Sequence, residues 1–189
     1  MELNTARLRI REFTEGDYSA LRDMDSRPEF NTYERVSASE TETRQSLDES
    51  ISTQLDVPRT VYRLAITIPP ADRVIGIIKI SCQFAKIREW EVGWAVHPDE
   101  WDRGIATEAA RCIIDWAIKE LNVHRVVAYC HADNAPSVRV MEKLGMLRDG
   151  RLREVRWLNG RWWDEYVYAV LEREWKSNNL ACTEAGMRV

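Results

Sequence analysis

Several features that mark specialised classes of protein are scarce in this sequence of 189 residues. Its four cysteines form no CxxC spacing and its three histidines are scattered, so neither a zinc site nor a redox pair is indicated. No apolar run approaches the length needed to cross a bilayer, and the N-terminus lacks the apolar segment of a signal peptide. We therefore expect a cytoplasmic protein that holds no metal and does not enter a membrane.

The chain also lacks a strong excess of charge of one sign. Its 27 Lys and Arg residues against 31 Asp and Glu residues give a formal net charge of −4. This balance argues against broad affinity for nucleic acid and permits a cationic substrate. Repeats, linkers and low-complexity segments are missing as well. The length therefore predicts one domain over residues 1–176, followed by a mobile tail over residues 177–189.

The period of the apolar residues changes along the chain and predicts a mixed α+β domain. Strands are expected at residues 7–13, 61–68, 74–81, 89–96, 125–130, 152–158 and 162–171. Helices are expected at residues 14–24, 37–55, 103–121 and 134–144. The strands between residues 61 and 96 indicate an antiparallel meander, and Asn159-Gly160 predicts a two-residue hairpin turn.

Some apolar side chains fall outside the expected core. Ile114 and Ile118 lie beside the main apolar stripe of the helix at 103–121, so we expect a second contact there, such as a partner subunit in a homodimer. In the helix at 37–55, the apolar stripe is narrow and ends at Leu55. Four aromatic residues near the hairpin either line a cleft or pack in a core or interface, and alternation favours core packing for half of them: Trp157, Trp162, Trp163 and Tyr166.

The stretch from Trp94 to Ala109, WAVHPDEWDRGIATEA, is the most informative part of the sequence. It is typical of the end of a buried strand, a polar loop and the entry to a helix. Unpaired backbone N–H groups and the positive end of the helix dipole meet at such a junction, which suits a phosphate-bearing ligand. Gly104 lets a ligand approach the backbone and Arg103 complements phosphate charge, although Gly104 also fits a simple tight turn.

The run EVGWAVHPDEWDRGIATEA, followed by NAPSVRVMEKLGM, resembles the two central motifs of the GNAT acetyltransferase superfamily. The pattern is most similar to the RimJ/RimL-type protein N-acetyltransferases, and TARLRIREF and WLNGRWWDEYVYAVLEREW extend the likeness over nearly all of residues 1–176. The resemblance implies the GNAT fold, a mixed and mostly antiparallel twisted sheet of about seven strands flanked by helices. It also implies an enzyme that uses acetyl-CoA.

The acceptor implied by this branch is a primary amine, with the α-amine of a protein N-terminus as the first candidate. A small amine is the alternative, such as a polyamine, an antibiotic or an amino acid derivative. A protein that binds acetyl-CoA without catalysis is a further possibility, since the tyrosine that commonly serves as general acid in the family falls on Met141.

By the same resemblance, backbone groups hold most of the cofactor. The residues implied for the pyrophosphate are Trp101, Asp102, Arg103, Gly104, Ile105, Ala106 and Thr107. Those implied for the pantetheine arm are Trp94, Ala95, Val96 and Asn134, with Arg139 and Lys143 beside the cofactor. Asp102 departs from the glycine usual at its place and puts a carboxylate beside the pyrophosphate, which either weakens affinity or is neutralised by Arg103.

Glu91 is the first candidate for the general base, because its strand carries the family's usual catalytic carboxylate. Partial burial would raise its pKa towards the working range. Glu89 shares its face and is the second candidate, and both fit solvated strand residues equally well. Ser137 occupies the place of the serine proposed as general acid in RimJ/RimL-type proteins, and it fits a helix cap as well. A strand amide near Val96 is implied for the oxyanion.

Overall fold

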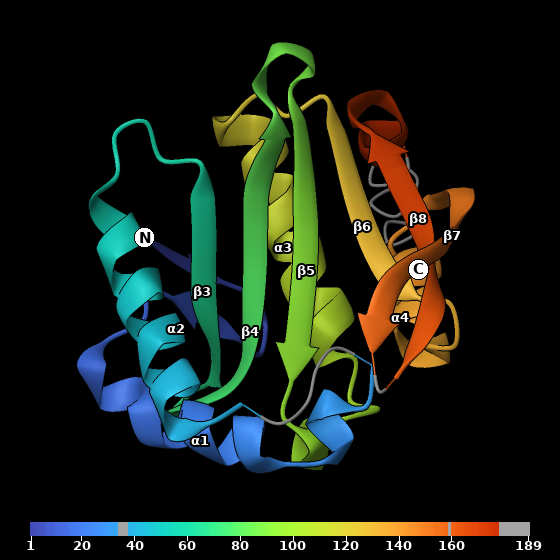
Figure 1. Cartoon of the computed structure of the whole chain (residues 1–189). Helices are drawn as coiled ribbons and strands as arrows, with labels where there is room; N and C mark the ends of the chain where they lie inside the picture. The colour runs from blue at the N-terminus through green and yellow to red at the C-terminus, as the bar shows by residue number, and fades with distance from the viewer. Residues whose placement is uncertain (34–37, 159, 178–189) are drawn as a thin grey trace, which may run out of the picture.

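A mostly antiparallel sheet forms the centre of the molecule (Figure 1). The computed structural model describes residues 1–33, 38–158 and 160–177, and in these residues the sheet has eight strands in the order β1-β2-β3-β4-β5-β6-β8-β7. Their bounds are β1 (Glu2–Asn4), β2 (Arg9–Arg11), β3 (Val61–Ile68), β4 (Ala71–Phe84), β5 (Glu89–Val96), β6 (Arg125–His131), β7 (Leu147–Leu158) and β8 (Arg161–Leu171). The predicted α+β class and meander are confirmed. The strand beyond the predicted seven is the short β1, and the predicted strand at 7–13 is reduced to β2.

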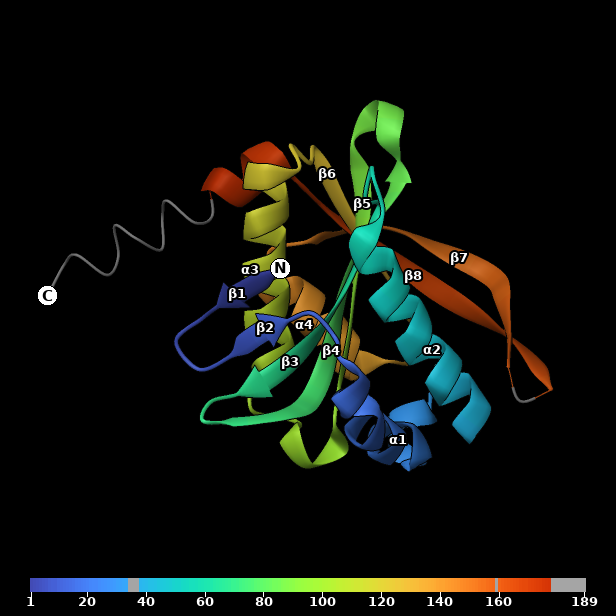
Figure 2. The ribbon, with the colours of Figure 1, turned by 90° about the vertical axis from the view of Figure 1, so that its left-hand side faces the viewer.

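The helices lie on both faces of the sheet. Their bounds are α1 (Tyr18–Ser26), α2 (Glu40–Ser52), α3 (Ile105–Glu120) and α4 (Ala135–Lys143). Figure 2 shows α1 and α2 on one face and α3 and α4 on the other. The start of α2 is fixed by a capping box, in which the Ser39 side chain accepts the Glu42 N–H and the Glu42 carboxylate accepts the Ser39 N–H.

The main apolar core lies between the sheet and α3. Ile114 (0% exposed) and Ile118 are both part of this core. The predicted second contact is therefore made within the chain, and their burial does not need the partner subunit offered as an example. The reason is that α3 is covered on a second side by the helical residues 172–177. Trp175 there is buried, and its indole Nε1 donates to Asp115 Oδ1 on α3 at 2.6 Å. Because α3 packs against both the sheet and residues 172–177, its buried face is wider than the single apolar stripe that the sequence shows.

Other side chains are more exposed than the sequence predicts. Trp157 is 59% exposed and Trp162 is 55% exposed, whereas Trp163 and Tyr166 are partly buried. Of the half predicted to pack in a core, Tyr166 packs against the main core, and Trp163 instead contacts the His131 ring. Leu55, at the end of the predicted helical stripe, is also exposed. The hairpin register, with Trp157 opposite Trp162, fits the predicted two-residue turn, although position 159 and the predicted tail beyond residue 177 lie outside the described residues.

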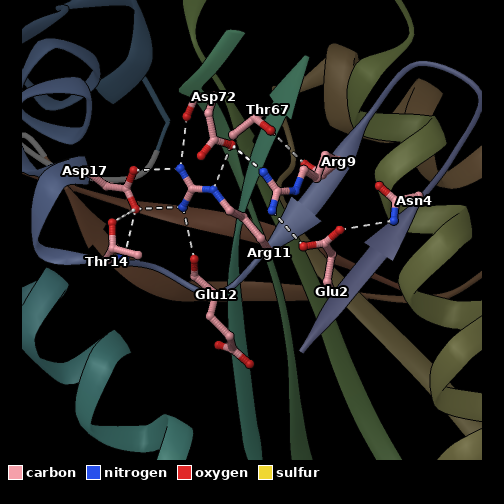
Figure 3. A network of polar contacts seen from close by, with 9 residues as sticks. All are labelled: Glu2, Asn4, Arg9, Arg11, Glu12, Thr14, Asp17, Thr67 and Asp72. Atoms are coloured by element: carbon pink, nitrogen blue, oxygen red, sulfur yellow. Dashed lines mark hydrogen bonds and ion pairs between the residues drawn. The ribbon is translucent and has the colours of Figure 1, made fainter. Parts of the chain in front are cut away.

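A buried guanidinium joins the first strands to α1 (Figure 3). The Arg11 Nη1 and Nη2 atoms donate to the two oxygens of Asp17 at 2.8 and 2.9 Å, and its Nε donates to Asp72 Oδ1 at 2.9 Å. Asp17 also accepts the Thr14 backbone N–H at 2.8 Å. Burial alone would raise the pKa of Asp17, but the hydrogen bonds from Arg11 and Thr14 outweigh it and lower the pKa.

Candidate functional site

The parallel strands β5 and β6 part after a short paired segment. Their register pairs only Glu89–Glu91 with Arg125–Val127, whereas β5 continues to Val96 and β6 to His131. Along the rest of their length β5 stays paired with β4, and β6 stays paired with β8. The inner edges of both strands are therefore open beyond Glu91 and Val127.

The open edge of β5 presents backbone groups in an alternating pattern. The His97 N–H donates to the Ile75 carbonyl just before the paired segment of β4 at 2.8 Å, so His97 and Ala95 direct their backbone groups towards β4. Because the direction alternates along a strand, Trp94 and Val96 direct theirs towards the side from which β6 has parted. An extended ligand can pair there as an added strand does.

A loop with two left-handed residues follows β5 and leads into α3. Asp102 has φ 57° and Gly104, the N-cap of α3, has φ 75°. Among residues with a side chain, Asp and Asn enter this region more readily than most, which accounts for an aspartate at a place where glycine is usual. A Cβ added at Gly104 would meet only Arg7 Nη2, at 3.8 Å, so the loop backbone is open to a ligand.

Side chains far apart in the sequence hold this loop in place. Arg7 Nη2 donates to the Arg103 carbonyl at 3.1 Å and to Glu108 Oε2 at 2.6 Å. Thr5 Oγ1 donates to Glu108 Oε1 at 2.5 Å. Burial alone would raise the pKa of Glu108, but the bonds from Thr5 and Arg7 lower it. No local pattern in the sequence points to Arg7 or Thr5, because their partners lie about a hundred residues away.

Two further contacts give roles that sequence reasoning missed or assigned differently. The indole Nε1 of Trp101 donates to the Val96 carbonyl at 2.7 Å and thereby ties the loop to the end of β5. Arg103 forms an ion pair with Glu100, so its charge is directed at Glu100 and not at Asp102. The remaining predicted loop residues, Ile105, Ala106 and Thr107, form the first turn of α3.

The start of α4 lies near the parted strands, since α4 follows the end of β6 directly. Asn134 is its N-cap, and Asn134 Oδ1 accepts the Ser137 backbone N–H at 3.1 Å. The Ser137 hydroxyl has no hydrogen-bond partner among the described residues. Arg139 and Lys143 are exposed and stand four residues apart on one side of α4. Met141 is buried in the main core.

The sheet face that carries α2 also carries Glu91. Arg63 on β3 reaches α2, where it donates to Ser50 Oγ at 2.5 Å, and Arg63, Lys79 and Gly93 are directly opposite one another in the register. Residues opposite one another share a face, and Glu91 is two residues from Gly93. Gln83 Nε2 donates to Glu91 Oε2 at 2.9 Å.

Glu89 on β5 and Tyr129 on β6 are both near Glu91, but their surroundings differ. Glu89 is buried and accepts a hydrogen bond from Arg125 Nε at 2.6 Å. Tyr129 on β6 is 39% exposed and stands two residues beyond Val127, the partner of Glu91. Burial, followed by the charges of Glu89 and Glu91, raises the pKa of Tyr129, so its hydroxyl stays protonated. Sequence reasoning missed Tyr129, because only the strand register brings it near Glu91.

The site thus has two parts. The parted strands β5 and β6 suit an extended ligand, and the open loop at the start of α3 suits a phosphate. The GNAT acetyltransferases, which the sequence resembles, are the class expected to have such a site. The model of the acetyltransferase (GNAT) domain family matches residues 7–147. The chain therefore belongs to the GNAT acetyltransferases and is an N-acetyltransferase enzyme, as the sequence predicts.

Individual relatives agree with this assignment. The uncharacterized N-acetyltransferase YnaD of Bacillus subtilis is 33% identical over 183 residues, covering 93% of this chain and 99% of the relative. A GNAT-family acetyltransferase structure from Bacillus anthracis is 30% identical, with a TM-score of 0.81, and covers 92% of this chain and 99% of its own. Mycobacterium smegmatis RimJ in complex with CoA-disulfide is 18% identical, with a TM-score of 0.77, and covers 88% of this chain and 83% of its own.

The described residues hold no candidate for two other kinds of site. In the described part of the chain, no three His, Cys, Asp or Glu side chains gather as metal ligands. Within the same residues, no helix is both long enough and apolar enough to cross a membrane.

Proposed function

We propose that the chain transfers the acetyl group of acetyl-CoA to the α-amine of a protein N-terminus. The observation that carries the proposal is the parting of β5 and β6 immediately after Glu91. In this proposal the thioester lies where the two strands part, beside the Glu91 carboxylate on the sheet face that carries α2. A protein acceptor is supported by the resemblance of the motifs to RimJ/RimL-type enzymes.

The chain's backbone supplies most of the cofactor contacts in this proposal. The backbone groups of Trp94 and the backbone N–H of Val96, on either side of Ala95, bind the pantetheine arm as an added strand. The Val96 carbonyl already accepts the Trp101 indole N–H. The loop from Trp101 to Thr107 binds the pyrophosphate at the start of α3. The Asn134 amide N–H reaches the same arm. Arg139 and Lys143 provide cations beside the cofactor.

Glu91 acts as the general base, directly or through a water molecule. An α-amine with a pKa near 8 is neutral in roughly a tenth of molecules at pH 7, against well under ~0.1% for a lysine side chain, so a base is useful in either case. Glu89 is the weaker candidate because Arg125 already occupies its carboxylate. Ser137 donates a proton to the leaving thiolate. The Val96 amide, which the resemblance implies for the oxyanion, lies five residues beyond Glu91, about 16 Å along an extended strand, so we assign it to the pantetheine arm instead. A thiolate leaves with little assistance, so the serine contributes less than the base.

The test of this proposal is the Glu91→Gln variant, with Glu120→Gln at the exposed end of α3 as the matched control. We expect a loss of at least about tenfold in the rate of CoA release for Glu91→Gln, because an amide cannot accept the proton. Calorimetry should give an unchanged affinity for acetyl-CoA. Full activity in Glu91→Gln would remove this residue from the mechanism.

A mass-shift screen of peptides and small amines identifies the acceptor. Acetylation of peptide α-amines supports the proposal, and acetylation confined to polyamines, antibiotics or amino acid derivatives contradicts the acceptor assignment. The cytoplasmic location is part of the same proposal. A homodimer would have to use a surface other than Ile114 and Ile118, such as the exposed Trp157 and Trp162.

A further inference from the structure

An uncompensated cation lies on the same sheet face as Glu91. Lys79 stands directly opposite Gly93 and is exposed, and none of the described residues bonds its ammonium group. The arginines of this face differ, because Arg63 donates to Ser50 and Arg156 donates to Glu165 at 2.6 Å. Lys79 is therefore a charge that a ligand can still neutralise.

The described residues leave room in front of Lys79. A Cβ added at Gly93, directly opposite, would meet none of their atoms within 4 Å. Figure 1 shows α2 to the left of β3 and α3 behind the sheet, and none of the labelled helices is drawn in front of β5. Lys79 and Glu91 are diagonal neighbours across β4 and β5, a relation that separates their β-carbons by about 7 Å. A small group at the base is thus also within reach of the lysine.

The charges of these two residues select for one kind of acceptor. Glu91 attracts and deprotonates an amine, whereas Lys79 repels a second positive charge and attracts a negative one. A polyamine would bring a second cation to Lys79, while an amine with a nearby carboxylate satisfies both side chains. The local charge pattern therefore refines the weak indication from the net charge of −4, which by itself permits any cationic substrate.

We propose that the acceptor carries a carboxylate a few bonds from its attacking amine, and that Lys79 binds this carboxylate. The inference rests on the proposed acetyl transfer and narrows its substrate class. An amine with a carboxylate a few bonds away occurs in peptides with Asp or Glu within their first two residues, and it also occurs in free amino acids. Peptides are the source that agrees with the proposed function.

The test compares three peptides that differ only at their second residue, which is Glu, Gln or Lys, together with free glutamate. For the wild type we expect kcat/KM to be about tenfold higher for the Glu peptide than for the Gln peptide, as a charge-assisted hydrogen bond gives. The preference should fall as salt is added, because the lysine is exposed. Acetylation of free glutamate alone would assign the carboxylate to a small molecule.

Substitutions at Lys79 then connect the preference to this residue. Lys79→Gln should remove the preference and Lys79→Glu should reverse it towards the Lys peptide, both with unchanged affinity for acetyl-CoA. The matched control is Lys119→Gln, an exposed lysine on α3, which should retain the preference. Equal kcat/KM for the Glu and Gln peptides, or an intact preference in Lys79→Gln, overturns the inference and leaves acetyl transfer standing. No acetylation of any acceptor overturns both.

Discussion

Asp102 is the residue at which backbone conformation and charge both favour glycine. Its φ is 57°, and its carboxylate lies at the proposed pyrophosphate site. Asp102→Gly should therefore tighten acetyl-CoA binding by about fivefold, because it removes the negative charge and lets the loop backbone adjust to the ligand. Calorimetric titration measures the change.

Asp102→Asn is the control that separates the two causes. An asparagine keeps the tolerance for positive φ and removes only the charge, so it should give most of the gain if repulsion dominates. An unchanged dissociation constant in both variants would show that the carboxylate does not face the cofactor.

Substitutions at Ser137 and Asn134 should have different effects, because we assign a chemical role to Ser137 and a structural role to Asn134. Asn134 accepts the Ser137 N–H, so Asn134→Ala should cost about 1 kcal/mol of stability through the lost cap. Ser137→Ala should leave the melting temperature unchanged and lower the rate by about threefold, less than the loss expected for Glu91→Gln. A drop in melting temperature with full activity in Ser137→Ala would assign this residue to the fold alone.

Residue placement was predictable where alternation along a strand decides it. The period of two in β5 places Glu91 on one face and Trp90 and Val92 on the other, and the structure buries the latter two. Contacts set by tertiary structure were not predictable. The bonds from Trp101 to the Val96 carbonyl and from Arg7 to the loop depend on how the loop folds back.

At the scale of elements, the junction between β5 and α3 is held from outside by the N-terminal segment. Arg7 bonds both the Arg103 carbonyl and Glu108 on α3. Arg7→Gln should weaken acetyl-CoA binding by several fold, because the loop must then be ordered at the cost of binding energy. Calorimetry should show the loss, and Arg44→Gln, at an exposed ion pair with Glu15 on the other side of the molecule, serves as control. Wild-type affinity in Arg7→Gln would show that the loop holds itself.

Elements were predicted well where a local pattern suffices. The bounds of β3 and β5 are those that the sequence pattern predicts. In β5 the buried and half-buried residues largely alternate, whereas β3 is buried on both faces, with Leu64 and Ile66 in one core and Ala65 in the other. A second contact at Ile114 and Ile118 was predicted, but the element that makes it was not, since it depends on the packing of residues 172–177 against α3. The exposure of Trp157 and Trp162 has a similar origin, as the hairpin end extends beyond the helices (Figure 2).

At the scale of the whole molecule, the Arg11 network predicts how stability depends on pH. The pKa of Asp17 is lower in the folded chain than in the unfolded chain, so its contribution is present above about pH 4 and is lost as the pH falls through the folded value. Asp17→Asn should cost about 3 kcal/mol at pH 7, because it leaves a buried guanidinium without its main partner. Denaturant unfolding at pH 7 and at pH 3 measures both effects.

The exposed Asp48→Asn on α2 is the control for this network and should change stability by less than about 0.5 kcal/mol. An equal loss in the two variants, or a loss in Asp17→Asn that is the same at both pH values, would contradict the assignment.

Because the strands part, binding of acetyl-CoA should change the rate of amide hydrogen exchange at particular residues of the sheet. Trp94 and Val96 lie in the middle of an eight-stranded sheet within the described chain, yet their amides face no neighbouring strand. These two amides should exchange quickly in the free protein and slowly with acetyl-CoA, while the amide of Ala95 between them, bonded towards β4, is protected in both states. Cofactor binding can thus be followed at single residues before any acceptor is known.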